Sequence, residues 1–150
     1  MRISNSLRLS ITSAALALAA CNNPPGPQLG QPAPVLYLTG QEQYSTGGKS
    51  FIRYNYDVLN KDSYPADMFD AAPNLPPCGL NTSSSRTWVD FYESNGTRIY
   101  GFCSLGSPAD LGRIWFAKEE GVVPPSWVYI EMTDRQTSTK YKSNLAETTP

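Results

Sequence analysis

An alternation of apolar and polar residues runs from Val35 almost to the end of the sequence, and it restricts the fold more than any other feature. Residues 50–59 show it most clearly, with Ile52, Tyr54, Tyr56 and Val58 at every second position. Successive side chains of a strand point to opposite faces, so this period indicates half-buried strands rather than helices. The chain also contains 13 Pro and 11 Gly, which interrupt the pattern often. We therefore expect short strands joined by turns.

Seven segments carry the strand pattern: 35–39, 50–59, 86–93, 97–103, 114–117, 127–132 and 139–142. Asn95-Gly96 lies between two of them and predicts a hairpin with a type I′ turn, because both residue types tolerate positive φ. Gly47-Gly48 predicts a glycine turn that leads into a strand, residues 134–137 a second hairpin, and 108–111 a helical turn. The number and spacing of the strands predict an all-β fold, an immunoglobulin-like or fibronectin-type β-sandwich of about seven strands. A small β-barrel is the alternative.

The first twenty residues have the features of a secretory signal. Arg2 and Arg8 precede an apolar run over 9–20, which is shorter than the roughly 20 residues that a membrane-crossing helix needs. The run ends in Leu18-Ala19-Ala20-Cys21, which resembles the lipobox of bacterial lipoproteins. The resemblance implies that Cys21 receives a diacylglyceryl group, that the chain is cut before it, and that its new amine is acylated.

The residue after the cysteine is Asn22 rather than Asp, which in the Gram-negative members of this family goes with the outer membrane. Two alternatives stay open at this point. Ordinary cleavage after Ala17-Leu18-Ala19 would release a soluble protein, and an uncleaved segment would remain as an anchor.

The predicted organisation has four parts. Residues 1–20 form the signal peptide, 21–34 the lipidated Cys and a Pro-rich tether, 35–146 the β-sandwich domain, and 147–150 a C-terminal tail. Because Pro, Gly and Gln dominate 22–34, we expect an extended spacer that holds the domain clear of the lipid headgroups.

The sequence has three cysteines, and lipidation of Cys21 leaves Cys78 and Cys103 as the possible disulfide pair. Export would place both where disulfides persist. Closing the loop between them would stabilise the fold by about 3.5 kcal/mol in the chain-entropy model.

The absence of histidine excludes an imidazole base, a Ser-His or Cys-His pair and His metal ligands. The mature chain has no basic cluster, so we expect no nucleic-acid partner, and we expect no cofactor. Asp62, Asp67 and Asp70 could offer oxygens to calcium together with Asn60, but their spacing matches no EF-hand. We interpret them as solvated turn residues and expect no metal.

The segment 72–80 contains three prolines and the predicted disulfide cysteine, so it should be extended and stiff. A preorganised loop has less ordering entropy to lose on binding. It is our candidate partner-binding loop, and a simple crossover between the two sheets is the alternative. The candidate binding residues are Leu75, Pro76, Pro77, Gly79 and Leu80.

Six aromatic residues could either fill the sandwich core or form a platform that stacks on sugars, and core packing is the more common outcome. They are Trp88, Tyr92, Tyr100, Trp115, Trp127 and Tyr129.

Together these features predict a non-enzymatic binding module, lipid-anchored in the cell envelope at the outer membrane. Its partner would be another envelope protein or a cell-wall glycan. The alternatives are a periplasmic hydrolase inhibitor acting through 72–80, a glycan-binding domain, and a spacer lipoprotein. An enzyme could still use carboxylates, Lys or Tyr, and the candidates for a carboxylate-based enzyme are Asp57, Asp62, Asp67 and Asp110.

Overall fold

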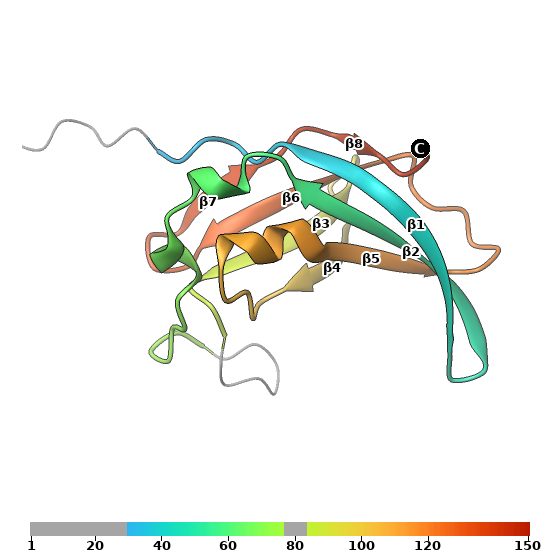
Figure 1. The fold of residues 1–150 in the computed structure, drawn as a ribbon, viewed down its shortest axis with the longest axis horizontal. Coiled ribbons are helices and arrows are strands. Elements are labelled where there is room, and N and C mark those ends of the chain that lie inside the picture. Colours follow the sequence, from blue (N-terminus) through green and yellow to red (C-terminus); the bar gives the residue numbers. More distant parts are fainter. Residues whose placement is uncertain (1–29, 77–83) are drawn as a thin grey trace, which may run out of the picture.

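The computed structural model describes residues 30–76 and 84–150. In these ranges the chain forms eight strands and three short 3₁₀ helices (Figure 1). In chain order they are β1 (Leu36–Thr46), β2 (Lys49–Val58), η1 (Lys61–Ser63), η2 (Ala66–Phe69), β3 (Thr87–Glu93), β4 (Arg98–Phe102), η3 (Pro108–Arg113), β5 (Ile114–Glu119), β6 (Trp127–Asp134), β7 (Thr139–Lys142) and β8 (Ala146–Glu147).

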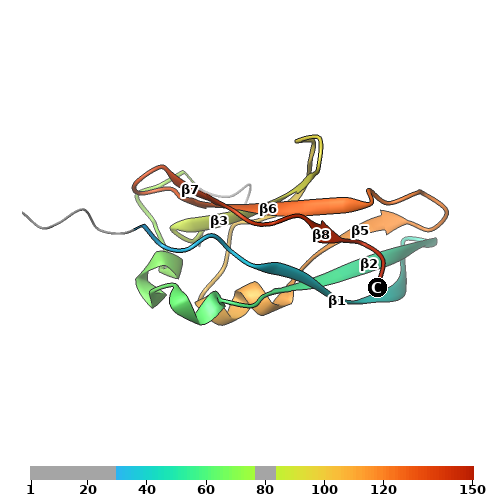
Figure 2. The ribbon, with the colours of Figure 1, turned by 90° about the horizontal axis from the view of Figure 1, so that it is seen from above.

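The strands form two antiparallel sheets that face each other. One has three strands in the order β1-β2-β5, and the other has five, in the order β4-β3-β6-β7 with β8 also paired to β6. Figure 2 shows them as two layers, with the 3₁₀ helices at one end of the three-stranded layer. The predicted β-sandwich is confirmed, and its strand order fits the fibronectin-type arrangement. The described strands do not close into a ring, so the barrel alternative is wrong.

The core lies between the layers and follows from the alternation in the sequence. Tyr54 and Tyr56 of β2 point inward and are buried, and β5 places Phe116 against both of them. From the opposite sheet, Phe91 of β3 completes a ring cluster with centroids 5.3 Å from Tyr56 and 5.6 Å from Phe116. Burial of a large apolar side chain of this kind contributes roughly 1.5–3 kcal/mol to folding.

Both glycine-containing hairpins are present, and one has a different turn from the prediction. Gly47 and Gly48 both have positive φ, at 58° and 76°, and join β1 to β2 as a two-residue turn. In the β3–β4 hairpin Gly96 has positive φ, but Asn95 does not, so the predicted type I′ turn is wrong. The Asn95 side chain instead accepts a hydrogen bond from the Thr97 N–H at 2.8 Å, which turns the side chain back onto the backbone.

The end of the chain joins the two sheets. The Asn144 amide accepts a hydrogen bond from the Leu36 N–H at 2.8 Å and donates one to the Leu36 carbonyl at 3.0 Å. Gln41 of β1 donates to the Thr148 carbonyl at 2.6 Å, and Thr148 is buried. Residues beyond 146 thus pack with the sandwich, and β8 was not among the predicted strands.

The last part of the predicted tether also lies against the domain. Asn60 accepts a hydrogen bond from the Val35 N–H and donates one to the Ala33 carbonyl, both at 2.9 Å. The Tyr64 hydroxyl donates to the Pro32 carbonyl at 2.7 Å, and burial raises the Tyr64 pKa to about 12. Among the described residues, no helix has the length and apolar character needed to cross a membrane.

Candidate functional site

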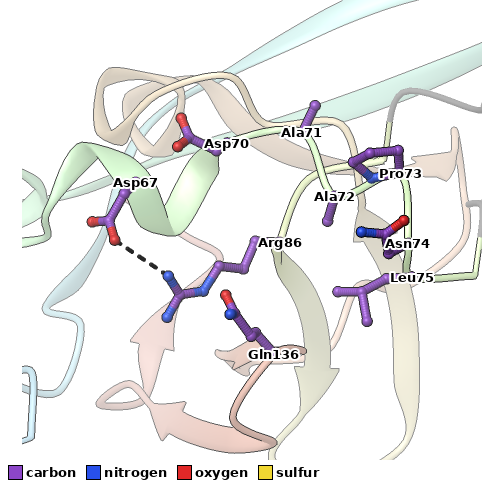
Figure 3. A pocket seen from close by; sticks show the side chains of 9 residues that line it. All are labelled: Asp67, Asp70, Ala71, Ala72, Pro73, Asn74, Leu75, Arg86 and Gln136. Atoms are coloured by element: carbon purple, nitrogen blue, oxygen red, sulfur yellow. Dashed lines mark hydrogen bonds and ion pairs between the residues drawn. The ribbon is translucent and has the colours of Figure 1, made fainter.

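The described part of the predicted loop forms one wall of a cavity of about 510 Å³ (Figure 3). Residues 71–75 make this wall, and Asp67, Asp70, Arg86 and Gln136 make the rest. These four residues lie in or just after η2, just before β3 and in the β6–β7 turn, which the sandwich brings to one end. A volume of this size lies within the usual range for ligand pockets.

A short stem holds the loop in place. Ala71 and Ser85 form an isolated β-bridge, and the Ala72 N–H donates to the Ser84 carbonyl at 2.9 Å. Within the wall, the Leu75 N–H donates to the Ala72 carbonyl at 3.0 Å and closes a turn. The first two contacts pair the chain on the two sides of the loop, at residues 71–72 and 84–85.

Arg135 ties the two described ends of the loop together. Its guanidinium donates to the Pro76 carbonyl at 2.8 Å and to the Ser84 hydroxyl at 3.4 Å. The same group lies 3.9 Å from the centre of the Trp88 ring, a cation–π contact that holds it over the outer face of β3. Trp88 therefore supports the loop.

The charges at the base of the cavity are fixed by one ion pair. Arg86 donates from Nε and Nη2 to the two carboxylate oxygens of Asp134, at 2.9 Å and 2.6 Å. Asp134 is only 4% exposed, and its hydrogen bonds from Arg86 lower its pKa. The same pair raises the pKa of Arg86. Two-point pairing of this kind is strong and sets the orientation of the guanidinium.

The remaining Arg86 donor, Nη1, faces the cavity. It contacts Asp67 at 3.3 Å, and Asp67 is 65% exposed, so this contact is weak compared with the one to Asp134. Figure 3 shows Gln136 beside Arg86, with Leu75 and Asn74 across the opening. The cavity thus offers one oriented cationic donor, two carboxylates, two amides and an apolar wall.

The other predicted loop residues can be placed only in part. Leu75 and Pro76 are described, and Leu75 is half-buried. Pro77, Cys78, Gly79 and Leu80 lie outside the described residues, as does Cys21. The Cys103 carbonyl accepts a hydrogen bond from the Ser85 N–H at 2.8 Å, which puts Cys103 next to the loop stem. The Cys78–Cys103 disulfide stays a prediction.

The four carboxylates proposed for an enzyme do not form one site. Lys61 donates to both oxygens of Asp57, at 2.8 Å and 2.9 Å. Asp110 accepts from the Gly106 and Ser107 N–H groups and caps η3, the helical turn predicted from sequence. Asp67 lies in the loop cavity, and Asp62 is exposed in η1. Across 30–76 and 84–150 there is no cluster of three or more acidic or Cys side chains suited to a metal ion.

The six aromatic residues are not core residues, so the expectation that they fill the sandwich was wrong. The core is built from other rings, and of the six only Tyr129 is buried, against Tyr92 and Lys142 on the outer face of the five-stranded sheet. The alternation itself contains the signal that would have placed them. Trp115, for example, stands between Ile114 and Phe116, which both point inward.

Comparison with known proteins gave no match to a family model, a curated protein or a solved structure.

Proposed function

We propose that this chain is an envelope lipoprotein, anchored through lipidated Cys21, whose domain is a non-enzymatic binding module for another exported protein. The single observation that carries the binding role is the cavity beside the 72–80 segment. Residues 72–75, the first part of the segment that the sequence singled out, belong to one wall of this cavity, and the loop stem is held by backbone bonds and by Arg135.

The lining favours a partner that presents a basic or amide-bearing side chain. Asp67 and Asp70 are exposed, whereas the charge of Arg86 is already balanced by buried Asp134. The cavity therefore carries an excess of negative charge. Gln136 and Asn74 add donors and acceptors that fix orientation, and Leu75 and Pro73 supply apolar contact.

The position of the Leu75 side chain favours a site that receives a side chain of the partner over a loop that inserts its own. An inhibitor loop inserts an exposed side chain into an enzyme, but Leu75 is half-buried and lines the cavity (Figure 3). The charged groups also favour binding over catalysis. A general acid or base needs a pKa near the working pH, whereas pairing moves the pKa of Asp134 down and that of Arg86 up, away from neutrality.

Position-specific crosslinking in the producing cells tests the binding site. A photoreactive residue replaces Asn74 at the exposed wall of the cavity, and a matched control replaces Ser45, exposed near the tip of the β1–β2 hairpin. We expect a discrete protein adduct from position 74 that is absent from position 45. The Asp67→Asn, Asp70→Asn double variant should reduce its yield several-fold. The same adducts from both positions, or a yield that the double variant leaves unchanged, would contradict the proposed site.

Mass spectrometry of the protein from the membrane fraction tests the anchor. We expect a mature N-terminus at Cys21 that carries the mass of its acyl chains, and loss of membrane attachment in Cys21→Ser. An unmodified N-terminus after Ala19 would instead show ordinary cleavage and a soluble protein.

A further inference from the structure

A second hollow, of about 480 Å³, lies on the outer face of the three-stranded sheet, the face turned toward the viewer in Figure 1. It shares no lining residue with the loop cavity. Its polar and aromatic groups come from all three strands and the end of η3: Thr39, Glu42, Arg53, Asn55, Arg113 and Trp115. We call it the Trp115 groove.

Trp115 is the fixed element of this groove. Its ring stacks on Tyr100 of β4, with centroids 5.3 Å apart and planes 24° apart, and the edge of Phe102 supports it at 6.1 Å. The Arg53 guanidinium lies 5.3 Å from the same ring. These contacts join the open edges of the two sheets, and Tyr100 remains 41% exposed beside them. The aromatic surface is therefore preorganised, because its rings are held by each other rather than by a ligand.

Asn55 provides the groove with a side-chain amide that makes no hydrogen bond within the described part of the chain. It is directly opposite Trp115 in the β2–β5 register, so both side chains lie on the same face a few ångströms apart. Its backbone carbonyl accepts from the hydroxyl of Thr39, at a β-bulge in β1, which fixes the strand beneath it. Within the described part of the chain, neither the Asn55 amide nor the Trp115 indole N–H has a hydrogen-bond partner. Both are available to a ligand.

The groove carries no surplus charge. Arg53 pairs with Glu42 across the hairpin, and Arg113 pairs with Asp110 of η3. An ionic ligand would have to break one of these pairs, whereas a neutral ligand would not. The Arg53 Nε is buried and also lacks a partner, so this end of the guanidinium is not saturated by the protein.

We infer that the Trp115 groove binds a neutral, β-linked glycan. A β-1,4-linked glycan is an extended ribbon whose rings present flat faces of C–H groups, which suits the Trp115–Tyr100 aromatic surface, whereas an α-1,4-linked chain curls. The equatorial hydroxyls of the β-linked glycan both donate and accept hydrogen bonds. In the groove, the amide of Asn55 can do both, Arg53 can donate and Glu42 can accept. An acidic polysaccharide or a charged peptide would lack this match, because the charges of the groove are already paired.

Isothermal titration of the full-length membrane-extracted protein, in a detergent without sugars, tests the inference. The probes are hexasaccharides of β-1,4-linked glucose and of β-1,4-linked N-acetylglucosamine, with α-1,4-linked glucose as the linkage control. We expect one β-linked probe to bind and the α-linked probe to bind at least tenfold more weakly. Asn55→Ala and Trp115→Ala should each weaken binding about tenfold, which corresponds to losing one good contact.

Trp127→Ala is the matched control, since Trp127 is an exposed tryptophan outside the groove, and its binding should be unchanged. Asn55→Ala keeps the test decisive if Trp115→Ala unfolds, because the Asn55 amide bonds nothing in the described protein. No binding of either β-linked probe at millimolar concentration would overturn the inference. So would binding that Asn55→Ala leaves intact, or equal binding of the α-linked probe. None of these outcomes changes the crosslink expected at position 74, so the two proposals fail separately.

Discussion

At the scale of single residues, Asp134 is the carboxylate that orients Arg86 in the loop cavity. It is buried, receives two hydrogen bonds from Arg86, and accepts a third from the Gln136 N–H at 3.0 Å. Asp134→Asn would leave Arg86 without its main counter-charge. We expect a loss of about 3 kcal/mol in the free energy of unfolding at neutral pH, since breaking one partner of a buried pair leaves an uncompensated charge.

The pH dependence of this loss has a definite sign. The folded pKa of Asp134 is lowered, so its contribution is present above the unfolded pKa of about 3.9 and disappears as the pH falls through the folded pKa. Urea unfolding should show a large gap between the natural protein and Asp134→Asn at pH 7 and a shrinking gap below pH 4. Asp62→Asn, at an exposed carboxylate, serves as control and should change stability by less than about 0.5 kcal/mol. A gap that is constant from pH 7 to pH 3 would contradict the assigned role.

At the scale of elements, the side chain of Asn144 links the two sheets by hydrogen bonds to the backbone of β1. Its two hydrogen bonds to Leu36 connect the chain just before β8 to the start of β1. We expect Asn144→Ala to lower the free energy of unfolding by about 2 kcal/mol, roughly 1 kcal/mol for each bond. Asn74→Ala removes an exposed amide and should be close to neutral. Equal urea midpoints for the two variants would show that the Asn144 bonds contribute nothing.

Sequence patterns located the strands well where one face of the strand is buried. β2 has the predicted alternation, with Tyr54, Tyr56 and Val58 inward. β1 is longer than predicted because its second half, including Gln41 and Gln43, lies in a hairpin that is exposed on both faces, and such a strand has no apolar period to detect. β8 has two residues and was missed because its pairing depends on contacts distant in sequence.

The candidate sites were likewise predictable from the sequence only in part. The 72–80 segment was selected from its prolines, but Arg86 and Gln136 are far from it in sequence and reach its described part only through the sandwich. The Trp115 groove was missed because apolar and aromatic residues were both assigned to the core. Their outward positions in the alternation, as at Trp115, were the signal that was overlooked, and the fold shows that these residues lie outside the core.

At the scale of the whole molecule, the start of the described chain, at Gly30, and the loop cavity lie at the same end. Gly30 and Gln31 line a further hollow of about 370 Å³ that shares Asp67 and Arg86 with the loop cavity. The nine residues 22–30 can span at most roughly 30 Å. With Cys21 in a membrane, the loop cavity would therefore stay within a few nanometres of the bilayer surface.

This reach predicts that the partner at the loop cavity is held in the same membrane. Inserting 20 Gly/Ser residues between Asn23 and Pro24 would move the domain outward by about 25 Å on average, since a flexible chain extends as the square root of its length. The longer tether should lower the yield of the adduct at position 74 several-fold, because the effective concentration of a membrane-held partner falls with linker length. The fold and the lipid mass at Cys21 should be unchanged, and both can be checked in the same sample. An unchanged adduct yield would instead identify the partner as a freely diffusing exported protein, for which the distance from the membrane does not matter.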